Sequence, residues 1–225
     1  MTSKGDRLIQ VELHAHTYAS KDSLVQPEKL LERCDQLKID RIAITDHNVI
    51  ETAFEMKERA PDRVIVGEEI ATTRGEILGY FMTEWVPPRL EPMETIERLR
   101  SQGAVISLAH PFDTTRRHWT GEEILELSPY IDAIEVFNAR CMNNTPNIRA
   151  AAFAQKNNLL MTSGSDAHSL WEVGQASMKM PDFSDAESFR QALAEAQQEQ
   201  RLSPPFVHLF SRVATLNKKL TRLLK

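Results

Sequence analysis

Short apolar runs alternate along the chain with longer stretches in which apolar residues recur at helical spacing. The alternation predicts strands followed by helices, the order that builds a mostly parallel sheet. We expect seven strands, near residues 8–13, 41–45, 63–66, 77–82, 104–109, 133–137 and 159–162. We expect helices near residues 27–37, 49–59, 92–102, 121–127, 145–157 and 184–198. About seven such units with short strands favour a closed or nearly closed α/β barrel, with an open doubly wound sheet as the alternative.

Residues 201–225 carry a further apolar pattern at helical spacing, with basic residues on the opposite face. The apolar positions are Phe206, Leu209, Phe210, Val213, Leu216, Leu220 and Leu223. The basic residues are Arg201, Arg212, Lys218, Lys219, Arg222 and Lys225. We therefore expect a barrel domain over residues 1–200 and a basic amphipathic helix over residues 201–225. The helix is expected to pack on the barrel or on a second subunit, with a membrane surface or nucleic acid as the alternative contact.

Composition narrows the classes of protein. The 225 residues are 41% hydrophobic and 26% charged, which suits one soluble domain with a sizeable core. Cys34 and Cys141 form no C-x-x-C pattern, which excludes a disulfide scaffold or zinc ribbon and indicates a reducing compartment. No apolar run approaches the roughly 20 residues of a membrane span, so we expect a cytoplasmic protein. The eight glycines form neither G-x-G-x-x-G nor a P-loop, which excludes the usual nucleotide cradles.

Charge is distributed unevenly along the chain. The formal net charge is −5, and residues 201–225 hold six of the 27 basic residues and no acid. The first 200 residues therefore hold 21 basic and 32 acidic side chains, a net charge of −11. A body this acidic argues against a broad nucleic-acid-binding face. The acidic charge does not exclude a short oligonucleotide or a small phosphorylated metabolite as a ligand.

Histidines and acids gather where the predicted strands end. They are His14, His16, Asp46, His47, Glu68, Glu69, His110, Asp166 and His168. In a parallel barrel these positions share one rim, where active sites are built. The two histidines of an H-x-H pair point to the same side of a strand. Imidazole and carboxylate without thiolate are ligands of Zn²⁺, Mn²⁺ or Fe²⁺, and so many donors require two or more ions.

Each of these elements alone has a simpler interpretation. Asp46 could cap the helix that follows it, because aspartate is a preferred N-cap. Glu68 and Glu69 could be a solvated pair, and His110 could be an ordinary loop histidine. Five of the seven histidines fall at strand ends with acids between them, and this set predicts a shared metal site. The remaining two, His118 and His208, are expected to be ordinary surface or packing residues.

The chain also resembles the PHP (polymerase and histidinol phosphatase) family of metal-dependent phosphoesterases. The resemblance rests on five segments in order, LHAHT at 13–17, ITDHN at 44–48, GEEI at 67–70, AHPF at 109–112 and GSDAH at 164–168. It extends from about residue 8 to about residue 175. It implies a distorted seven-stranded β/α barrel, similar to a TIM barrel, with a trinuclear metal site at the rim. The residues that the resemblance does not cover include the C-terminal helical extension.

Matching the family's motifs to this sequence one by one implies a set of metal ligands. One metal takes His14, His16, Glu69 and Asp166, a second shares Glu69 and takes His110, and a third takes Asp22, His47 and His168. Two positions depart from the family pattern. Asp22 follows His16 by six residues, where related sequences often have five. Glu76 stands where related sequences often carry a histidine, so it is either a substitute ligand of the second metal or a solvated glutamate.

The function that the resemblance implies is hydrolysis of a phosphate ester at two or three divalent ions, Mn, Zn or Fe. A metal-bridging hydroxide held by Glu69, His110 and Asp166 would be the nucleophile. Three ions and four carboxylates leave a net charge of about +2, which suits a phosphate anion. Side chains expected to hold substrate are Arg116, Asn138 and Arg140, the arginines by bidentate hydrogen bonds. The expected partner is a small phosphorylated substrate, either a phosphomonoester, a nucleotide or a short oligonucleotide, and the oligomeric state is left open.

Two other functions are alternatives. Amidohydrolase-type C–N hydrolases also begin with H-x-H on a barrel rim, but they usually place a lone aspartate after the last strand, whereas this chain has Asp166-x-His168. A catalytically silent, metal-stabilised interaction module would have lost several ligands, and only Glu76 departs here. The phosphoesterase hypothesis is therefore preferred.

Overall fold

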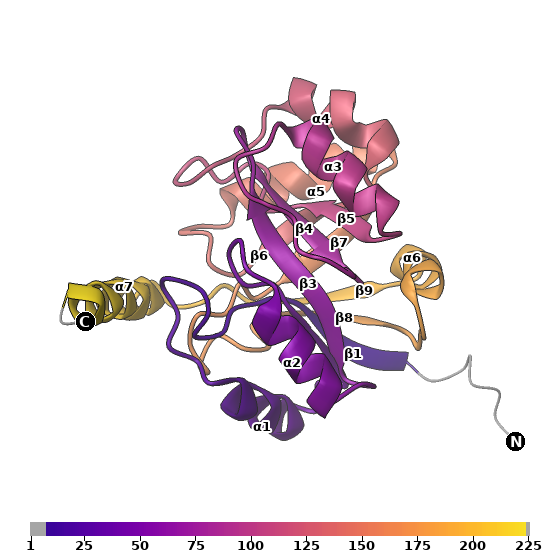
Figure 1. The fold of residues 1–225 in the computed structure, drawn as a ribbon. Helices are drawn as coiled ribbons and strands as arrows, with labels where there is room; N and C mark the ends of the chain where they lie inside the picture. The colour runs from indigo at the N-terminus through magenta and orange to yellow at the C-terminus, as the bar shows by residue number, and fades with distance from the viewer. Residues whose placement is uncertain (1–7, 224–225) are drawn as a thin grey trace, which may run out of the picture.

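The computed structural model describes residues 8–223, in which nine strands form one hydrogen-bonded sheet. The sheet curls into a nearly closed barrel (Figure 1), with the strand order β7-β6-β5-β4-β3-β2-β1-β8-β9. The strands are β1 (Leu8–Ala15), β2 (Arg41–Ile44), β3 (Val64–Ala71), β4 (Glu76–Tyr80), β5 (Val105–Leu108), β6 (Ala133–Asn138), β7 (Leu160–Gly164), β8 (Ala176–Pro181) and β9 (Gln197–Gln200). The first seven correspond to the expected strands. β8 and β9 were not expected, so the described chain has nine strands where seven were predicted.

The sheet is mixed rather than mostly parallel. Among the described strands, β1 with β2, β2 with β3, β5 with β6 and β6 with β7 are parallel. The pairs β3 with β4, β4 with β5, β1 with β8 and β8 with β9 are antiparallel. The few residues between β3 and β4 explain why β4 is reversed, because a parallel strand needs a crossover of about a dozen residues. The expectation of a mostly parallel sheet was therefore wrong.

Helices cover the outside of the barrel and one of its ends. They are α1 (Pro27–Leu37), α2 (Glu51–Arg59), α3 (Pro92–Ser101), α4 (Gly121–Leu127), the 3₁₀ turn η1 (Ser128–Tyr130), α5 (Thr145–Asn157), α6 (Ala186–Ala194) and α7 (Val207–Leu223). Figure 1 shows α1 and α2 on one side of the barrel and α3 to α5 on the opposite side. It also shows α6 and α7 at opposite ends of the barrel. The helix expected over 184–198 ends at Ala194, and β9 takes up the residues that follow.

Two apolar layers hold this arrangement together. Alternate strand residues such as Ile42, Ile44 and Ile134 face the surrounding helices. The other set, which includes Val11 and Ile65, fills the barrel together with residues of α6. On α6, Phe189 packs edge-on against Tyr80 with ring centroids 6.0 Å apart. The base of the barrel is therefore closed, and polar side chains can gather only at the opposite end.

Gly164 lets the edge strand β7 approach β1 and so nearly close the barrel. A Cβ at this position would lie 2.3 Å from the Cβ of His14 and 2.9 Å from Oε1 of Glu135. β7 therefore approaches β1 at a distance that only glycine allows. The backbone amide of His16 donates to the carbonyl of Ala167 just beyond β7, so the end of β7 is tied to the end of β1.

The C-terminal helix α7 contacts the barrel through small and polar side chains. Val207 and Ala214 are buried against the body, and Lys218 donates to the carbonyl groups of Tyr18 and Ser20. The apolar positions face outward instead, with Leu209 and Leu216 both 60% exposed. The expected contact of the helix with the barrel is therefore present, but small and polar side chains make it, and packing of the apolar face on a second subunit stays a prediction. Lys225 of the predicted tail lies outside the described residues, as do the side chains of Arg222 and Leu223.

Within residues 8–223, none of the helices combines the length and the apolar character needed to cross a membrane.

Candidate metal centre

Nine imidazole and carboxylate side chains converge at the end of the barrel that carries α7. They come from β1 and the loop after it (His14, His16, Asp22), from the loop after β2 (His47), from β3 and β4 (Glu69, Glu76), from the loop after β5 (His110) and from the loop after β7 (Asp166, His168). These are the nine residues expected from the sequence to bind metal. Glu68 and Glu69 lie inside β3 rather than after it, because β3 continues to Ala71.

Glu69 occupies the middle of this cluster. Its Oε2 lies 3.4 Å from Nε2 of His14 and 3.5 Å from Nε2 of His16. The same oxygen lies 2.7 Å from Nδ1 of His47, and its Oε1 lies 3.0 Å from Nε2 of His110. The neighbouring Glu68 points to the other face of β3, where it accepts a hydrogen bond from the Val86 amide. Alternation along the strand thus puts only one of the paired glutamates in the cluster.

Asp166 forms the deepest part of the cluster together with the H-x-H pair. Its Oδ1 lies 3.1 Å from Nε2 of His16 and 3.6 Å from Nε2 of His14. The rings of His14 and His16 have centroids 5.1 Å apart. These three residues are fully buried. Together their donor atoms lie close enough to bind one ion.

The outer part of the cluster is more open. Oδ1 of Asp22 lies 3.4 Å from Nε2 of His168 and 3.6 Å from Nε2 of His47. Glu76 lies on the other side, with its Oε2 3.4 Å from Nε2 of His110. His47, Glu69 and Glu76 also offer ligand atoms within reach of one ion. Glu76 therefore points into the cluster and not into bulk solvent.

A second layer of side chains orients the histidines. Nδ1 of His14 lies 2.9 Å from Oε1 of Glu135, and Nδ1 of His16 lies 3.0 Å from Oγ of Ser20. Nδ1 of His168 faces the Asp166 carbonyl at 2.8 Å. In all three rings the Nδ1 atom is bonded outward and Nε2 points inward. This is the arrangement typical of metal-ligating histidines, whose second nitrogen is held by a carboxylate, hydroxyl or carbonyl group.

Asp46 belongs to this second layer. Its Oδ1 accepts from the Thr17 amide at 2.7 Å and from Oγ of Ser20 at 2.6 Å. The residue before α2 is Ile50, which makes no side-chain cap. The interpretation of Asp46 as a helix cap was therefore wrong. Asp46 instead fixes the hydroxyl group that faces the ring of His16.

We expect Asp46→Asn to weaken metal binding by about 10–100-fold, because orienting residues of metal ligands typically contribute that much. The amide cannot accept from all the donors that surround this carboxylate. Metal affinity measured by competition with a chromophoric chelator checks the result. Asp62→Asn, at an exposed aspartate remote from the cluster, is the control, and equal affinity in both variants would show that Asp46 does not orient a ligand.

The electrostatics of the cluster are dominated by carboxylates. Burial lowers the pKa of His14, but the charges on Asp166, Glu135 and Glu69 outweigh burial and raise that pKa well above its usual value. Burial, with the charge on Glu69, raises the pKa of Glu76. The site thus holds excess negative charge, which a bound cation relieves.

Buried atoms without hydrogen bonds show that the donor set fits divalent cations. They are Nε2 of His14, Nε2 of His16, Oε2 of Glu69, Oδ1 of Asp166 and Oδ1 of Asp22. A buried polar atom without a partner costs free energy, and here five such atoms point toward one another. Imidazole nitrogen and carboxylate oxygen are the ligands of Zn²⁺, Mn²⁺ and Fe²⁺. The residues present therefore fit the metal centre that the sequence predicts.

Three of the described residues with a left-handed backbone conformation lie in or beside the cluster. His110 has a φ of 26° and Asp166 a φ of 53°, both in the left-handed region that non-glycine residues rarely adopt. Asn48, next to His47, has a φ of 58°. Such conformations persist where the surrounding structure imposes them, and they occur often at functional sites.

The three side chains expected to bind substrate all lie at the edge of the cluster. Arg116 donates to Oδ2 of Asp166 at 2.6 Å and to Oδ2 of Asp113 at 2.9 Å, and its side chain is 26% exposed. Asn138 is fully buried and donates to Asp166 and Glu135.

Arg140 is also mostly buried. It pairs with Glu172 at 3.1 Å and donates to Oγ of Ser211 on α7. Arg116 is therefore the one of the three that is both partly exposed and directly bonded to a cluster carboxylate.

Some residues of the site were missed from the sequence. Glu135 holds the ring of His14, and its Oε2 accepts from the His110 amide at 2.8 Å. Its signal was a single acid within the buried strand AIEVFN, where a charge needs a partner. Glu172, which accepts from the His168 amide, lies in an irregular loop and carries no comparable signal.

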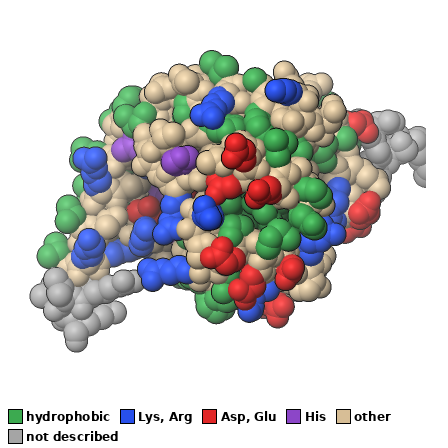
Figure 2. All heavy atoms as spheres, turned by 90° about the horizontal axis from the view of Figure 1, so that it is seen from above, with side chains coloured by type: hydrophobic (Ala, Val, Ile, Leu, Met, Phe, Trp, Pro, Cys, Tyr) green, Lys and Arg blue, Asp and Glu red, His purple; other side chains and the backbone are tan. Residues whose placement is uncertain are grey.

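Two hollows open beside the cluster. The larger, about 940 Å³, lies between the rim and α7 and adjoins Asp22. The smaller, about 420 Å³, adjoins His47 and Glu76. Figure 2 shows Lys and Arg side chains around a hollow on the side of the molecule that carries α7. The candidate metal centre is thus reachable from solvent on two sides.

The barrel and its cluster of histidines and carboxylates define the class of protein, a metal-dependent hydrolase. Residues 144–197 match the PHP-associated family. The chain is 41% identical over 179 residues to the uncharacterized protein MJ0417 of Methanocaldococcus jannaschii, covering 78% of this chain and 72% of the relative. The chain belongs to the PHP family.

Solved structures share the fold. A protein of Bifidobacterium adolescentis, assigned as a metal-dependent phosphoesterase, superposes with a TM-score of 0.62 at 18% identity, covering 82% of this chain and 95% of that one. The lesion-specific endonuclease PfuEndoQ of Pyrococcus furiosus superposes with a TM-score of 0.66 at 16% identity, covering 85% of this chain and 58% of that one. This chain therefore shares its barrel fold with proteins of low sequence identity.

Proposed function

We propose that the protein hydrolyses a phosphate ester at a di- or trinuclear centre of Mn, Zn or Fe. The observation that carries the proposal is the convergence of nine imidazole and carboxylate groups with unbonded buried donor atoms pointing inward. Family membership and the phosphoesterase and endonuclease neighbours support the same reaction class. The barrel over residues 1–200 is proposed to hold the whole metal centre, and the helix within 201–225 to form a wall of the larger hollow.

The ligand assignment follows the three groups of the cluster. His14, His16, Glu69 and Asp166 are proposed to hold one ion, Glu69, Glu76 and His110 a second, and Asp22, His47 and His168 a third. Divalent ions bound by these residues would supply a Lewis acid for the phosphoryl oxygens and would lower the pKa of a water that acts as the nucleophile. Glu69, His110 and Asp166 are proposed to surround that nucleophile.

Arg116 is proposed to act on the substrate from the rim. Its Nη1 and Nε are engaged by Asp166 and Asp113, and Nη2 lies 3.2 Å from Oδ1 of Asn138. These three hydrogen bonds hold the guanidinium in one orientation, and its two remaining N–H groups are proposed to stabilise negative charge on a phosphoryl oxygen. Asn138 and Arg140 are proposed to support the same wall, through Asp166 and Glu172 respectively.

Substrate profiling tests the reaction class. Metal-loaded protein is incubated with phosphomonoesters, phosphodiesters, short oligonucleotides and, as the alternative class, amides. We expect hydrolysis of at least one phosphate ester that is lost on chelation and restored by Mn²⁺, Zn²⁺ or Fe²⁺. Hydrolysis of amides alone would support the amidohydrolase alternative. Inactivity toward all esters with metals bound would support the silent module.

Replacing Arg116 by lysine is expected to lower kcat about 10–100-fold. Lysine keeps the charge but cannot bond two carboxylates and a third partner in one plane. Steady-state kinetics on the best ester from the panel checks this result. Arg74→Lys, at an exposed ion pair with Glu123, is the matched control. An unchanged kcat for Arg116→Lys would remove Arg116 from the proposed mechanism.

A further inference from the structure

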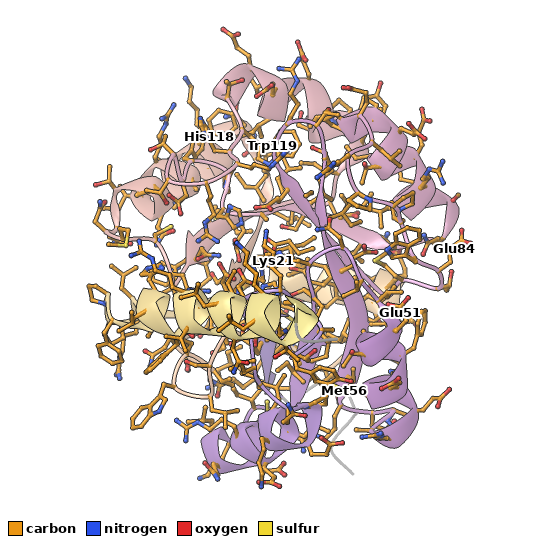
Figure 3. The ribbon with its side chains drawn as sticks, turned by 60° about the vertical axis from the view of Figure 1, so that its left-hand side comes forward. Lys21, Glu51, Met56, Glu84, His118 and Trp119 are labelled. Carbon is orange, nitrogen blue, oxygen red and sulfur yellow. The ribbon has the colours of Figure 1, made fainter. Side chains whose placement is uncertain are left out.

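The smaller hollow is lined by three basic side chains. Lys21 follows β1, Arg89 precedes α3, and Arg117 lies between β5 and α4. The hollow also adjoins His47 and Glu76 of the metal centre. Figure 3 shows Lys21 at the mouth of the barrel near α7.

These three cations have no acidic partner within residues 8–223. Arginines elsewhere on the molecule do, such as Arg41 with Asp182 and Arg190 with Asp132. Only a backbone carbonyl binds the guanidinium of Arg117, that of Thr72. Three cations and one carboxylate, Glu76, line this hollow, so its lining carries a net positive charge within an acidic body.

Backbone contacts hold part of this lining in place. The Arg89 amide donates to the carbonyl of Ala71 at the end of β3, and Arg89 itself has a φ of 66°. Nη1 of Arg117 donates to the carbonyl of Thr72 in the next turn. Both arginines are thus anchored beside the β3–β4 connection, a few residues from Glu69 and Glu76. Their positions relative to the metal ligands are set by the sheet.

The two hollows differ in chemistry. The larger hollow includes apolar Met142, Leu209 and Leu216. Its buried cation, Arg140, is paired with Glu172, and its other cation, Arg212, is exposed on α7. The smaller hollow has unpaired cations and a volume of about 420 Å³, within the range of small-ligand sites. The larger hollow suits an organic group, and the smaller one suits an anion.

We propose that the pocket of Lys21, Arg89 and Arg117 binds a second phosphate group of the substrate. The inference rests on the proposed function and deepens it. The preferred substrate then carries two phosphoryl groups, one hydrolysed at the metal centre and one held in this pocket. Its organic portion extends toward the hollow beside α7.

A matched pair of substrates tests the proposal. A sugar monophosphate and the corresponding sugar bisphosphate are compared on metal-loaded wild type and on Arg89→Gln. We expect kcat/KM for the bisphosphate to fall about tenfold or more, because a hydrogen bond between charged groups is lost. We expect kcat/KM for the monophosphate to change less than about twofold. Arg89→Lys should restore most of the loss.

Arg98→Gln, at an exposed helical ion pair with Glu94, is the control for surface charge and should leave both substrates unchanged. An equal loss for both substrates in Arg89→Gln, or no loss for either, overturns the pocket assignment. A KM that rises for the bisphosphate alone identifies a binding effect, because a general loss of stability would affect both substrates.

A binding measurement separates this inference from the reaction itself. Inorganic phosphate is titrated by calorimetry into the metal-free wild type and into Arg89→Gln. The carboxylates of the metal-free cluster repel phosphate, and the part of the binding that is lost in Arg89→Gln reports the basic pocket. We expect at least about tenfold weaker binding in the variant. Binding that Arg89→Gln leaves unchanged overturns the inference, whereas binding weakened as expected in a protein inactive on every ester would overturn only the proposed reaction.

Discussion

Replacing Glu69 by glutamine is expected to lower turnover by about 10³-fold and to reduce the number of bound metal ions. Glu69 lies within 3.5 Å of His14, His16, His47 and His110, so it reaches every part of the cluster. Glutamine keeps the shape but removes the charge and one acceptor oxygen. Metal ions contribute several kcal/mol of transition-state stabilisation, and each 1.36 kcal/mol is tenfold in rate.

The neighbouring residue supplies the control for this experiment. Glu68 is also buried in β3 but faces the Val86 amide. Burial raises the pKa of Glu68 to about 8, so at pH 7 Glu68→Gln changes little charge. We expect Glu68→Gln to keep the wild-type metal content, measured by elemental analysis, and the wild-type rate. If Glu69→Gln matched Glu68→Gln in both, the central role of Glu69 would be refuted.

Strands and helices could be predicted from the sequence where apolar residues recur regularly or where a helix has a clear start signal. The bounds of α1, α4 and α5 coincide with the expected ranges because each helix has a recognisable start, a proline in the first turn of α1 and α5 and the Thr120 capping box of α4. β9 was missed because its sequence QQEQ is polar, as suits an exposed edge strand. β4 was found, but its antiparallel direction was not predicted, because apolar runs indicate a buried strand without giving its direction.

The metal-ligating residues of the candidate site could be predicted because their residue types alone indicate metal binding. Histidines and acids at strand ends identified the cluster, since imidazole and carboxylate ligands have few other reasons to recur there. The orienting layer was not predictable, because Asp46 and Ser20 are ordinary turn residues and their partners come from distant segments. The outward apolar face of α7 was also unpredictable, since periodicity identifies a face but not what covers it.

Gly164→Ala is expected to destabilise the protein by about 3 kcal/mol and to disturb metal binding. The added methyl group would lie 2.3 Å from the Cβ of His14 and 3.2 Å from its backbone nitrogen. Neither atom is the free end of a flexible side chain, so β1 and β7 must separate. Overpacking of a tight core typically costs about 1–3 kcal/mol and occasionally more, and this contact is closer than most.

Chemical denaturation of the metal-free protein measures the effect of Gly164→Ala without the contribution of bound ions. Gly121→Ala is the matched control, because its nearest neighbour is a ring atom of Phe153 at 3.1 Å and alanine suits the first turn of α4. We expect the control to stay within about 0.5 kcal/mol of wild type. If both variants were equally stable, β7 and β1 would have room for a side chain. The barrel would then be less tightly closed at His14 than the geometry indicates, and the H-x-H pair would not depend on that closure for its position.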